Sequence, residues 1–265
     1  MPGVTSDRVL QVSLSRGVAT LTLDSPANRN ALSRAMRAQL REALADALAD
    51  DAVRVVVLDH TGRVFCSGMD LSEAAGGSSE DQGVREFPEL LELLWWAPKP
   101  VVAVVRGPAR AGGVGLLAAC DVVVAASSAT FAFSEVRLGL VPAVISAVVL
   151  PRMTTHVAHR LMLSGEVFDA ATAAAGGLLD LVAADDEVDA VLAGQLTALA
   201  AGAPVALAET KRLLRARQPG LLFEPLLDLS ARFFAGEEGQ EGIAAFREKR
   251  PARWVPAADD PTRGQ

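Results

Sequence analysis

Cysteine and histidine are scarce in this chain of 265 residues. Two cysteines, Cys66 and Cys120, cannot form a disulfide framework, and three histidines are too few for a Cys/His zinc site. His156 and His159 would share one helix face, but no acidic or cysteine partner stands at ligand spacing, so we expect no metal there. This usage is typical of a reducing compartment, and we expect a cytoplasmic protein.

Long apolar runs are also missing. The most apolar stretch, residues 138–150, is interrupted by Gly139 and Pro142 and falls short of the ~20 residues that a membrane helix needs. Residues 1–8 contain no apolar signal core. The sequence therefore predicts a soluble protein that is neither secreted nor bound to a membrane.

Basic residues are outnumbered, with 25 Lys and Arg against 32 Asp and Glu and a formal net charge of −7. The chain offers no bulk positive charge to neutralise many phosphates, so nucleic acid is not an expected partner. Because 51% of the residues are hydrophobic, the chain can bury the core of one large domain, and global disorder is excluded.

Hydrophobic periodicity predicts an α/β order first and mostly helices afterwards. Ser33 is expected to cap a helix that ends near residue 50, and a short apolar helix should end near Cys120. Strands are expected at residues 9–14, 18–23, 53–58, 101–105, 121–124, 131–133 and 178–182.

We divide the chain into a core, residues 1–200, and a helical C-terminal region, residues 201–265. The Gly/Ser-rich acidic stretch at residues 74–86 is expected to be a flexible loop or lid. Residues 221–234 are apolar on more than one face, which predicts self-association.

A first candidate segment, residues 60–73, follows a predicted strand and precedes a helical stretch. Asp70 with Glu73 resembles a capping box, which would place the Met69 amide beside a helix N-terminus, where N–H groups favour an anion. The alternative is a capped turn without any binding role.

A second segment, residues 106–116, carries Gly112, Gly113 and Gly115 after a strand. Glycines let the backbone approach a ligand closely and present unblocked amides to it. The spacing does not match a dinucleotide fingerprint. The alternative is that these glycines serve tight packing of the helix against the sheet.

A third segment, residues 131–142, places Glu135 among apolar residues. Burial would raise the pKa of this carboxyl group and suit it to proton transfer. The alternative is a salt bridge to Arg137 or Arg152.

Taken together in this order, the segments resemble the enoyl-CoA hydratase/isomerase family, the crotonase superfamily, over nearly the whole chain. The resemblance implies a crotonase-like spiral of ββα units whose helical C-terminal region forms a homotrimer or homohexamer. The matching segments are residues 25–32, 65–71, 111–115, 120–121, 133–140 and 245–250.

The resemblance also implies the site. The backbone amides of Met69 and Gly112 would form an oxyanion hole for the thioester carbonyl of an acyl-CoA, and Glu135 would transfer the proton. No metal or redox cofactor is implied, because CoA arrives as part of the substrate.

The implied CoA contacts are spread along the chain. The Ser67 carbonyl would meet the adenine and Arg29 the phosphates, while the remaining contacts are Asp70, Leu71, Phe246 and Lys249, the last two from this or a neighbouring subunit. Alternatively, Arg29 and Lys249 are solvated surface charges.

Gly115 stands where hydratases of this family carry a second glutamate, so a lone carboxylate fits an isomerase that shifts a 3-enoyl to a 2-enoyl thioester. With this glycine, however, residues 134–146 resemble hydratases of branched or terpenoid-derived enoyl-CoAs. We therefore rank addition of water to a 2-enoyl-CoA first, isomerisation second, and a noncatalytic acyl-CoA or RNA-binding scaffold third.

A substitution at position 115 bears on this ranking. If the missing glutamate at position 115 limits hydration, Gly115→Glu should raise the rate of hydration of short unbranched substrates. An inactive but folded variant would instead indicate that position 115 faces tight packing or a bulky substrate. Weaker candidates for a second acid are Asp70, Glu73, Glu80, Asp81, Glu86 and Glu89.

Overall fold

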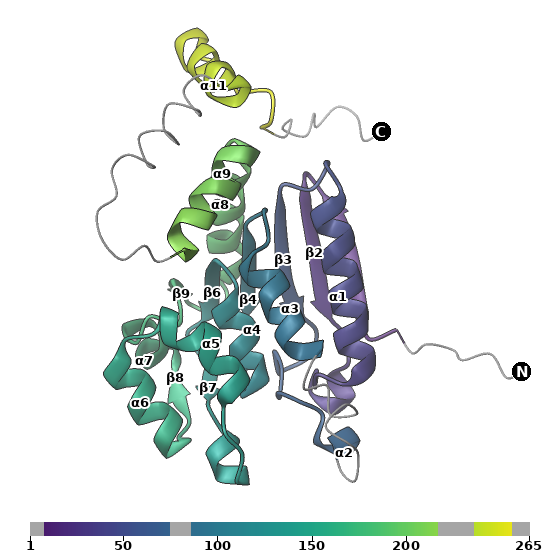
Figure 1. The fold of residues 1–265 in the computed structure, drawn as a ribbon, viewed down its shortest axis with the longest axis vertical. Coiled ribbons are helices and arrows are strands. Elements are labelled where there is room, and N and C mark those ends of the chain that lie inside the picture. The colour runs from purple at the N-terminus through teal and green to yellow at the C-terminus, as the bar shows by residue number, and fades with distance from the viewer. Residues whose placement is uncertain (1–7, 75–85, 217–235, 256–265) are drawn as a thin grey trace, which may run out of the picture.

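The computed structural model describes residues 8–74, 86–216 and 236–255 (Figure 1). The flexible loop expected at residues 74–86 falls almost wholly outside the described residues, and so does the apolar segment at 221–234. The division at residue 200 stays a prediction.

The main sheet has six strands in the order β1-β2-β3-β4-β6-β9. β1 and β2 form an antiparallel hairpin through Arg16 and Gly17, whose φ angles of 49° and 74° suit a two-residue turn, and every other pairing is parallel. The strands are β1 Leu10–Ser15, β2 Val18–Leu23, β3 Val55–His60, β4 Val101–Val105, β6 Val122–Ala126 and β9 Leu181–Ala183. The expected strand at 178–182 began too early by three residues.

A second, smaller sheet has the order β5-β7-β8. Its strands are β5 Ala109–Arg110, β7 Thr130–Ala132 and β8 Phe168–Asp169. β7 matches the strand expected at 131–133, while β5 and β8 are two residues long and leave no periodic signal in the sequence.

The helices follow the expected order. Ser33 caps α1, because its side-chain oxygen accepts a hydrogen bond from the Met36 amide at 3.2 Å. The helices are α1 Arg34–Ala49, α2 Leu71–Ala74, α3 Glu86–Trp95, α4 Gly112–Ala119, α5 Ala143–Arg152, α6 Thr155–Ser164, α7 Ala170–Ala175, α8 Val188–Ala200, α9 Pro204–Arg215 and α11 Glu237–Glu248, with 3-10 turns η1 Pro26–Asn28 and η2 Glu135–Leu138. Within the described ranges no single helix is long and apolar enough to span a bilayer, and α8 and α9 reach that threshold only as a pair bent by 106°.

Both faces of the main sheet are buried. Val56 and Leu58 of β3 point to the face covered by α1, α3, α4 and α5, while Val55 and Val57 point to the opposite face, against α8 (Figure 1). Parallel strands covered on both faces read as continuous apolar runs, which is the pattern of β3, β4 and β6.

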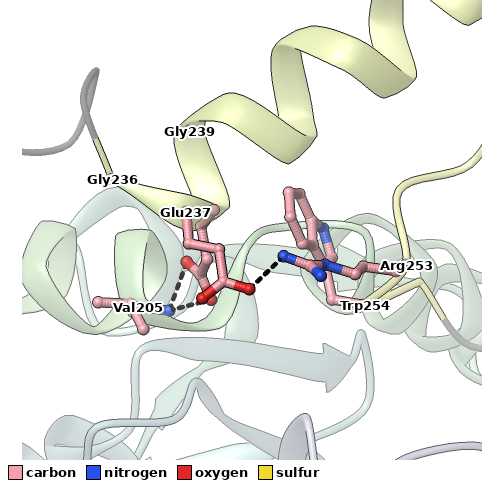
Figure 2. Close-up of a pocket in the computed structure, with 7 residues that line it drawn as sticks. Val205, Gly236, Glu237, Gly239, Arg253 and Trp254 are labelled. Atoms are coloured by element: carbon pink, nitrogen blue, oxygen red, sulfur yellow. Dashed lines mark hydrogen bonds and ion pairs between the residues drawn. The ribbon is translucent and has the colours of Figure 1, made fainter.

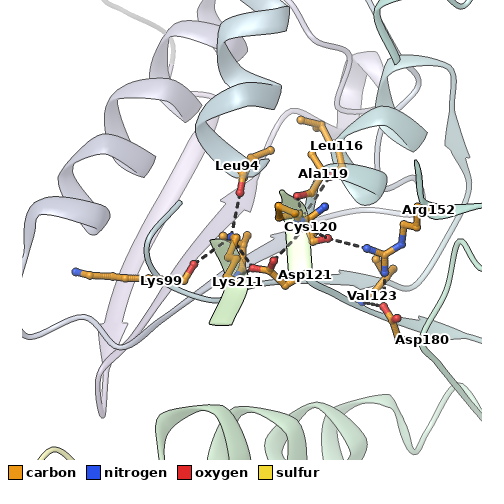
Figure 3. A network of polar contacts seen from close by, with 12 residues as sticks. Leu94, Lys99, Leu116, Ala119, Cys120, Asp121, Val123, Arg152, Asp180 and Lys211 are labelled. Atoms are coloured by element: carbon orange, nitrogen blue, oxygen red, sulfur yellow. Dashed lines mark hydrogen bonds and ion pairs between the residues drawn. The ribbon is translucent and has the colours of Figure 1, made fainter. Parts of the chain in front are cut away.

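A polar network joins α9 to the end of α4 (Figure 3). The Lys211 ammonium is buried and donates to Asp121 at 2.7 Å and to the carbonyls of Leu94 and Lys99. Arg215 donates to the second Asp121 oxygen at 3.0 Å. Burial lowers the pKa of Lys211, and the Asp121 carboxylate opposes that shift. Asp121 therefore compensates two cations held away from water.

Asp121→Asn should lower the free energy of unfolding by about 3 kcal/mol, because it keeps the side-chain shape but leaves both cations without their carboxylate. Urea denaturation measures the loss. Asp186→Asn, at an exposed turn, is the matched control and should change stability by less than about 0.5 kcal/mol. Equal losses in the two variants would contradict the role assigned to Asp121.

Candidate functional site

Two chain segments run side by side beyond the carboxyl ends of β3 and β4. The Phe65 amide donates to the Pro108 carbonyl at 3.0 Å, Cys66 pairs with Ala109 in a parallel bridge, and the Arg110 amide donates to the Cys66 carbonyl at 2.9 Å. Parallel strands end at the same edge of a sheet, so the segments that follow them meet there.

Glycines allow the two segments to approach each other closely. A Cβ on Gly113 would lie 2.7 Å from the Cys66 carbonyl oxygen, which no real Cβ tolerates. Gly68 has a φ of +91°, and a Cβ on it would lie 3.4 Å from the Gly112 nitrogen. The structure thus brings Gly68, which precedes Met69, next to the Gly112 nitrogen.

The Met69 and Gly112 amides are available as donors. Gly112 is the first residue of α4, where an N–H has no intrahelical acceptor, and Ala111 before it takes an unusual φ of 47°. Among the described residues, neither amide donates to another protein group. An N–H group that has no protein acceptor can stabilise negative charge on an oxygen, above all at a helix start such as that of Gly112.

Asn30 ties the turn before α1 to the segment that carries Met69. It is fully buried with a φ of 52°. Its Oδ1 accepts from the Ser25 amide at 2.7 Å, and its Nδ2 donates to the carbonyls of Thr61 at 3.0 Å and Val64 at 2.8 Å. Asn30 therefore satisfies main-chain groups on both segments.

Leu32 continues this attachment. Its amide donates to the Gly68 carbonyl at 2.8 Å, and it forms a parallel bridge with Met69. The buried Arg37 guanidinium donates to the Leu32 carbonyl at 2.6 Å and to Glu86 at 3.1 Å, while its Nη2 has no partner in the described part of the chain. The Met69 peptide is thus held through Leu32 by a buried cation.

Neither Asn30 nor Arg37 is singled out by motif spacing. Arg37 could have been found, because it lies on the apolar stripe that carries Leu40 and Leu44, and a charge within such a stripe indicates a specific buried partner. No such pattern points to Asn30, which the sequence singles out only as part of the matching segment 25–32.

The capping box predicted at Asp70 forms only in part. The Asp70 carboxylate accepts from the Ser72 amide at 3.0 Å and its hydroxyl at 2.6 Å, and these bonds lower the pKa of Asp70. Glu73 instead accepts from the Arg34 amide at 2.8 Å, at the start of α1. Glu73 thus makes a tertiary contact with α1 in place of the local reciprocal bond.

Glu135 lies beside the same site. It follows β7, whose Ala132 carbonyl accepts from the Ala111 amide at 3.0 Å, next to Gly112. Its Oε2 is buried and has no hydrogen-bond partner among the described residues. Burial raises the pKa of Glu135, as predicted from its apolar surroundings.

The alternative salt bridge of Glu135 is wrong. Arg137 donates to the Ser164 carbonyl at 3.1 Å. Arg152 pairs with Asp180 and donates to the Cys120 carbonyl at 2.7 Å. Both cations are engaged elsewhere, and neither forms a salt bridge with Glu135.

Position 115 is tightly packed rather than empty. A Cβ on Gly115 would lie 2.5 Å from Ile145 Cγ2 and 3.6 Å from Phe87 Cζ. A Cβ on Gly112 would lie 3.3 Å from the same Phe87 atom and 3.1 Å from Leu32 Cδ1. The first turn of α4 is therefore covered by three apolar side chains from three segments.

Of the weaker candidates for a second acid, Asp70, Glu73 and Glu86 are already engaged in the contacts described above. Glu89 is exposed. Glu80 and Asp81 fall outside the described residues.

The residues implied in CoA contacts are only partly brought together. The Ser67 amide donates to the Arg29 carbonyl at 3.1 Å, and Arg29 is exposed. Lys249 follows α11, and the nearby Trp254 carbonyl accepts from Arg54 at the opposite end of β3 (Figure 1). A single chain thus does not place Lys249 near Arg29. The side chains of Leu71 and Phe246 fall outside the described residues.

Two further cavities are formed by helices, and neither is lined by Met69, Gly112 or Glu135. A cavity of about 520 Å³ between α9 and α11 contains the Glu237–Arg253 ion pair and Trp254 (Figure 2), far from Met69. A groove of about 350 Å³ runs between α3 and α5. The groove is lined by Pro88, Leu91, Glu92, Trp95, Trp96, Ala143, Val144, Ala147 and Val148.

We next consider metal ligands and reactive thiols among the described residues. They contain no group of three or more His, Cys, Asp or Glu residues able to hold a metal ion. Cys66 and Cys120 are buried, and burial raises the pKa of each thiol to about 12.

Gly113→Ala should lower the free energy of unfolding by roughly 2 kcal/mol, because the added methyl group meets the Cys66 carbonyl oxygen. Gly194→Ala is the matched control. It lies inside α8 with open space around its Cβ position and should stabilise the protein by about 1 kcal/mol. Urea denaturation separates the two, and a neutral Gly113→Ala would contradict the close approach.

Comparison with known proteins identifies the family of this chain. The sequence profile of the family described as enoyl-CoA hydratase/isomerase matches residues 13–256. The 2,3-dehydroadipyl-CoA hydratase of Escherichia coli (strain K12) is 35% identical over 247 residues, which cover 91% of this chain and 96% of that protein.

Several solved structures are similar to this chain over nearly its whole length. Pseudomonas aeruginosa AtuE has a TM-score of 0.87 and 39% identity, covering 94% of this chain and 100% of that one. An enoyl-CoA hydratase of Mycobacterium smegmatis has a TM-score of 0.86 and 32% identity, covering 94% and 99%. The crotonase-like α/β fold predicted from the sequence is thereby confirmed, and the chain belongs to the enoyl-CoA hydratase/isomerase family.

Proposed function

We propose that this protein adds water to the double bond of a 2-enoyl-CoA thioester. The observation that carries the proposal is the presence of two unpaired amide donors, Met69 and Gly112, in the same part of the fold as Glu135, whose buried Oε2 has no hydrogen-bond partner among the described residues. The hydratase name of the Escherichia coli relative supports the same choice.

The thioester carbonyl is the group that the two amides recognise. Its oxygen accepts hydrogen bonds from the N–H groups of Met69 and Gly112, and these bonds strengthen as negative charge develops on that oxygen. A preorganised donor of this kind contributes about 3 kcal/mol to lowering the barrier. Because both donors belong to the main chain, substitution of the Met69 side chain alone should not remove the effect.

Glu135 moves the proton. Its carboxylate takes a proton from water while the water oxygen bonds to the β-carbon, and the electron pair of the double bond shifts toward the thioester oxygen. The resulting carboxylic acid then returns the proton to the α-carbon. One carboxylate suffices for both transfers, and a pKa raised toward neutrality by burial favours them.

The CoA part of the substrate extends over the surface near Arg29. In this proposal Arg29 meets the phosphates and the Ser67 carbonyl the adenine, with Asp70 and Leu71 alongside. Phe246 and Lys249 then come from a second chain, because α11 lies at the end of the fold opposite to α2, which follows Met69 (Figure 1). A cytoplasmic homotrimer or homohexamer would satisfy this requirement, and no cofactor besides the CoA moiety takes part.

Isomerisation of a 3-enoyl to a 2-enoyl thioester is the second candidate. The packing of Ile145 against Gly115 favours it, because it leaves Glu135 as a lone carboxylate that could take a proton from the α-carbon and return it to the γ-carbon. Ultraviolet absorbance separates the two reactions. A hydratase removes the conjugated enoyl thioester, whereas an isomerase creates it.

Glu135→Gln should lower kcat for hydration of a 2-enoyl-CoA by about 100-fold, because the amide cannot accept the proton from water. The assay follows the loss of enoyl thioester absorbance. Glu42→Gln, at an exposed position of α1, is the matched control and should retain full activity. Unchanged turnover in Glu135→Gln would remove Glu135 from the mechanism.

The same substitution should change how stability depends on pH. Because burial raises the pKa of Glu135, the folded protein binds this proton more tightly than the unfolded chain, and stability falls as pH rises through the raised pKa. Gln does not titrate. The Tm of Glu135→Gln relative to the parent should therefore increase between pH ~4 and pH ~8. A Tm difference that stays constant over this range would contradict the burial of the carboxyl group.

A further inference from the structure

We propose that Ile145 is a specificity-determining residue, which excludes any side chain from position 115 and forms the wall against which the acyl carbons of the substrate pack. The first part rests on packing alone. The second part rests on the proposed function, because it requires an acyl thioester whose carbonyl lies at the Met69 and Gly112 amides.

The contact between Ile145 and α4 is close. Ile145 is 3% exposed, and its Cγ2 lies 2.5 Å and its Cβ 3.1 Å from the position of a Cβ on Gly115. A side chain at residue 115 would therefore have to displace the branched end of a buried isoleucine. No such displacement is cheap in a close-packed interior.

The backbone around Ile145 leaves it little freedom to move. α5 ends at Arg152, whose guanidinium donates to the Cys120 carbonyl at 2.7 Å and to the Leu178 carbonyl at 3.0 Å. Cys120 is the C-cap of α4. The two helices are thus linked at their ends, and Ile145 is held against the first turn of α4.

Phe87 extends the same wall. Its Cζ lies 3.3 Å from the Cβ position of Gly112 and 3.6 Å from that of Gly115. Residues three apart on a helix share a face, so the ring spans the distance between the two glycines. In the proposed binding mode, an acyl chain whose carbonyl oxygen lies at the Gly112 amide would extend past the first turn of α4, which Phe87 and Ile145 cover. Both side chains are apolar and buried, so in this proposal their volume limits the space left for the acyl carbons.

Stability measurements test the first part without any substrate. Gly115→Ala and Ile145→Ala should each lower Tm by roughly 5 °C, the first by overpacking and the second by leaving a cavity. In the double variant, Ile145→Ala should raise the Tm of Gly115→Ala, because it removes the atoms that the new methyl group meets.

Val148→Ala is the matched control on α5. Val148 is 6% exposed but lines the groove between α3 and α5. The Val148→Ala substitution should lower Tm by the same amount whether residue 115 is glycine or alanine. If Ile145→Ala behaves in this additive way too, or if Gly115→Ala leaves Tm unchanged, Ile145 does not exclude a side chain there and the first part is overturned.

Substrate preference tests the second part. The measured quantity is the ratio of kcat/KM for 3-methylbut-2-enoyl-CoA to kcat/KM for but-2-enoyl-CoA. Ile145→Ala should raise this ratio about tenfold, because trimming the wall makes room for an additional methyl group. Val148→Ala should leave it unchanged. An unchanged ratio in Ile145→Ala overturns the second part.

Failure of the proposed function gives a different result. If the protein hydrates neither thioester, or if Glu135→Gln is as active as the parent, the hydratase assignment fails. The opposite effects of Ile145→Ala on Tm with glycine and with alanine at position 115 would persist in that case, because they depend only on packing between α4 and α5.

Discussion

The contact on which the candidate site depends is the approach of two main-chain segments, residues 65–69 and 108–113. Hydrogen bonds between their backbones hold them in parallel, and Gly68 and Gly113 remove the side-chain atoms that would keep them apart. The two amide donors belong to these segments. Their separation is therefore set by backbone geometry and by the absence of Cβ atoms, and not by the rotamers of flexible side chains.

α4 is held at both ends, which maintains the direction of the Gly112 amide. At its start, the Ala111 amide donates to the Ala132 carbonyl at 3.0 Å, which also places the segment that leads to Glu135. At its end, Arg152 and Arg215 donate to the Cys120 carbonyl at 2.7 Å and 3.1 Å. Cations at a helix C-terminus are electrostatically favourable, and here they come from α5 and α9. The C-terminal helices thus support a site at the far end of α4.

The site retains features that disfavour folding. Ala111 takes a φ of 47° without being glycine, and Glu135 and Arg37 each carry a buried polar atom that has no partner among the described residues. Such groups cost stability unless the surrounding structure holds them in place. The continuous apolar core on both faces of the main sheet supplies that support. Available donors and a carboxyl group with a raised pKa are the features that proton transfer at a thioester requires.

The sequence by itself determined the alternation of elements, the capping of α1 by Ser33 and the segments in which Met69, Gly112 and Glu135 lie, because periodicity, caps and glycine-rich turns are local properties. It did not reveal β5 or β8 or the bond from Glu73 to α1, since each of these depends on segments distant in the chain. The place of Arg37 on the apolar stripe of α1 indicates a buried partner, but only the tertiary structure showed that its partners are the Leu32 carbonyl and Glu86. The environment of Gly115 is the clearest example. The missing side chain is visible in the sequence, but only the packing of α5 on α4 decided that Ile145 fills the space, because volume is shared between residues far apart along the chain.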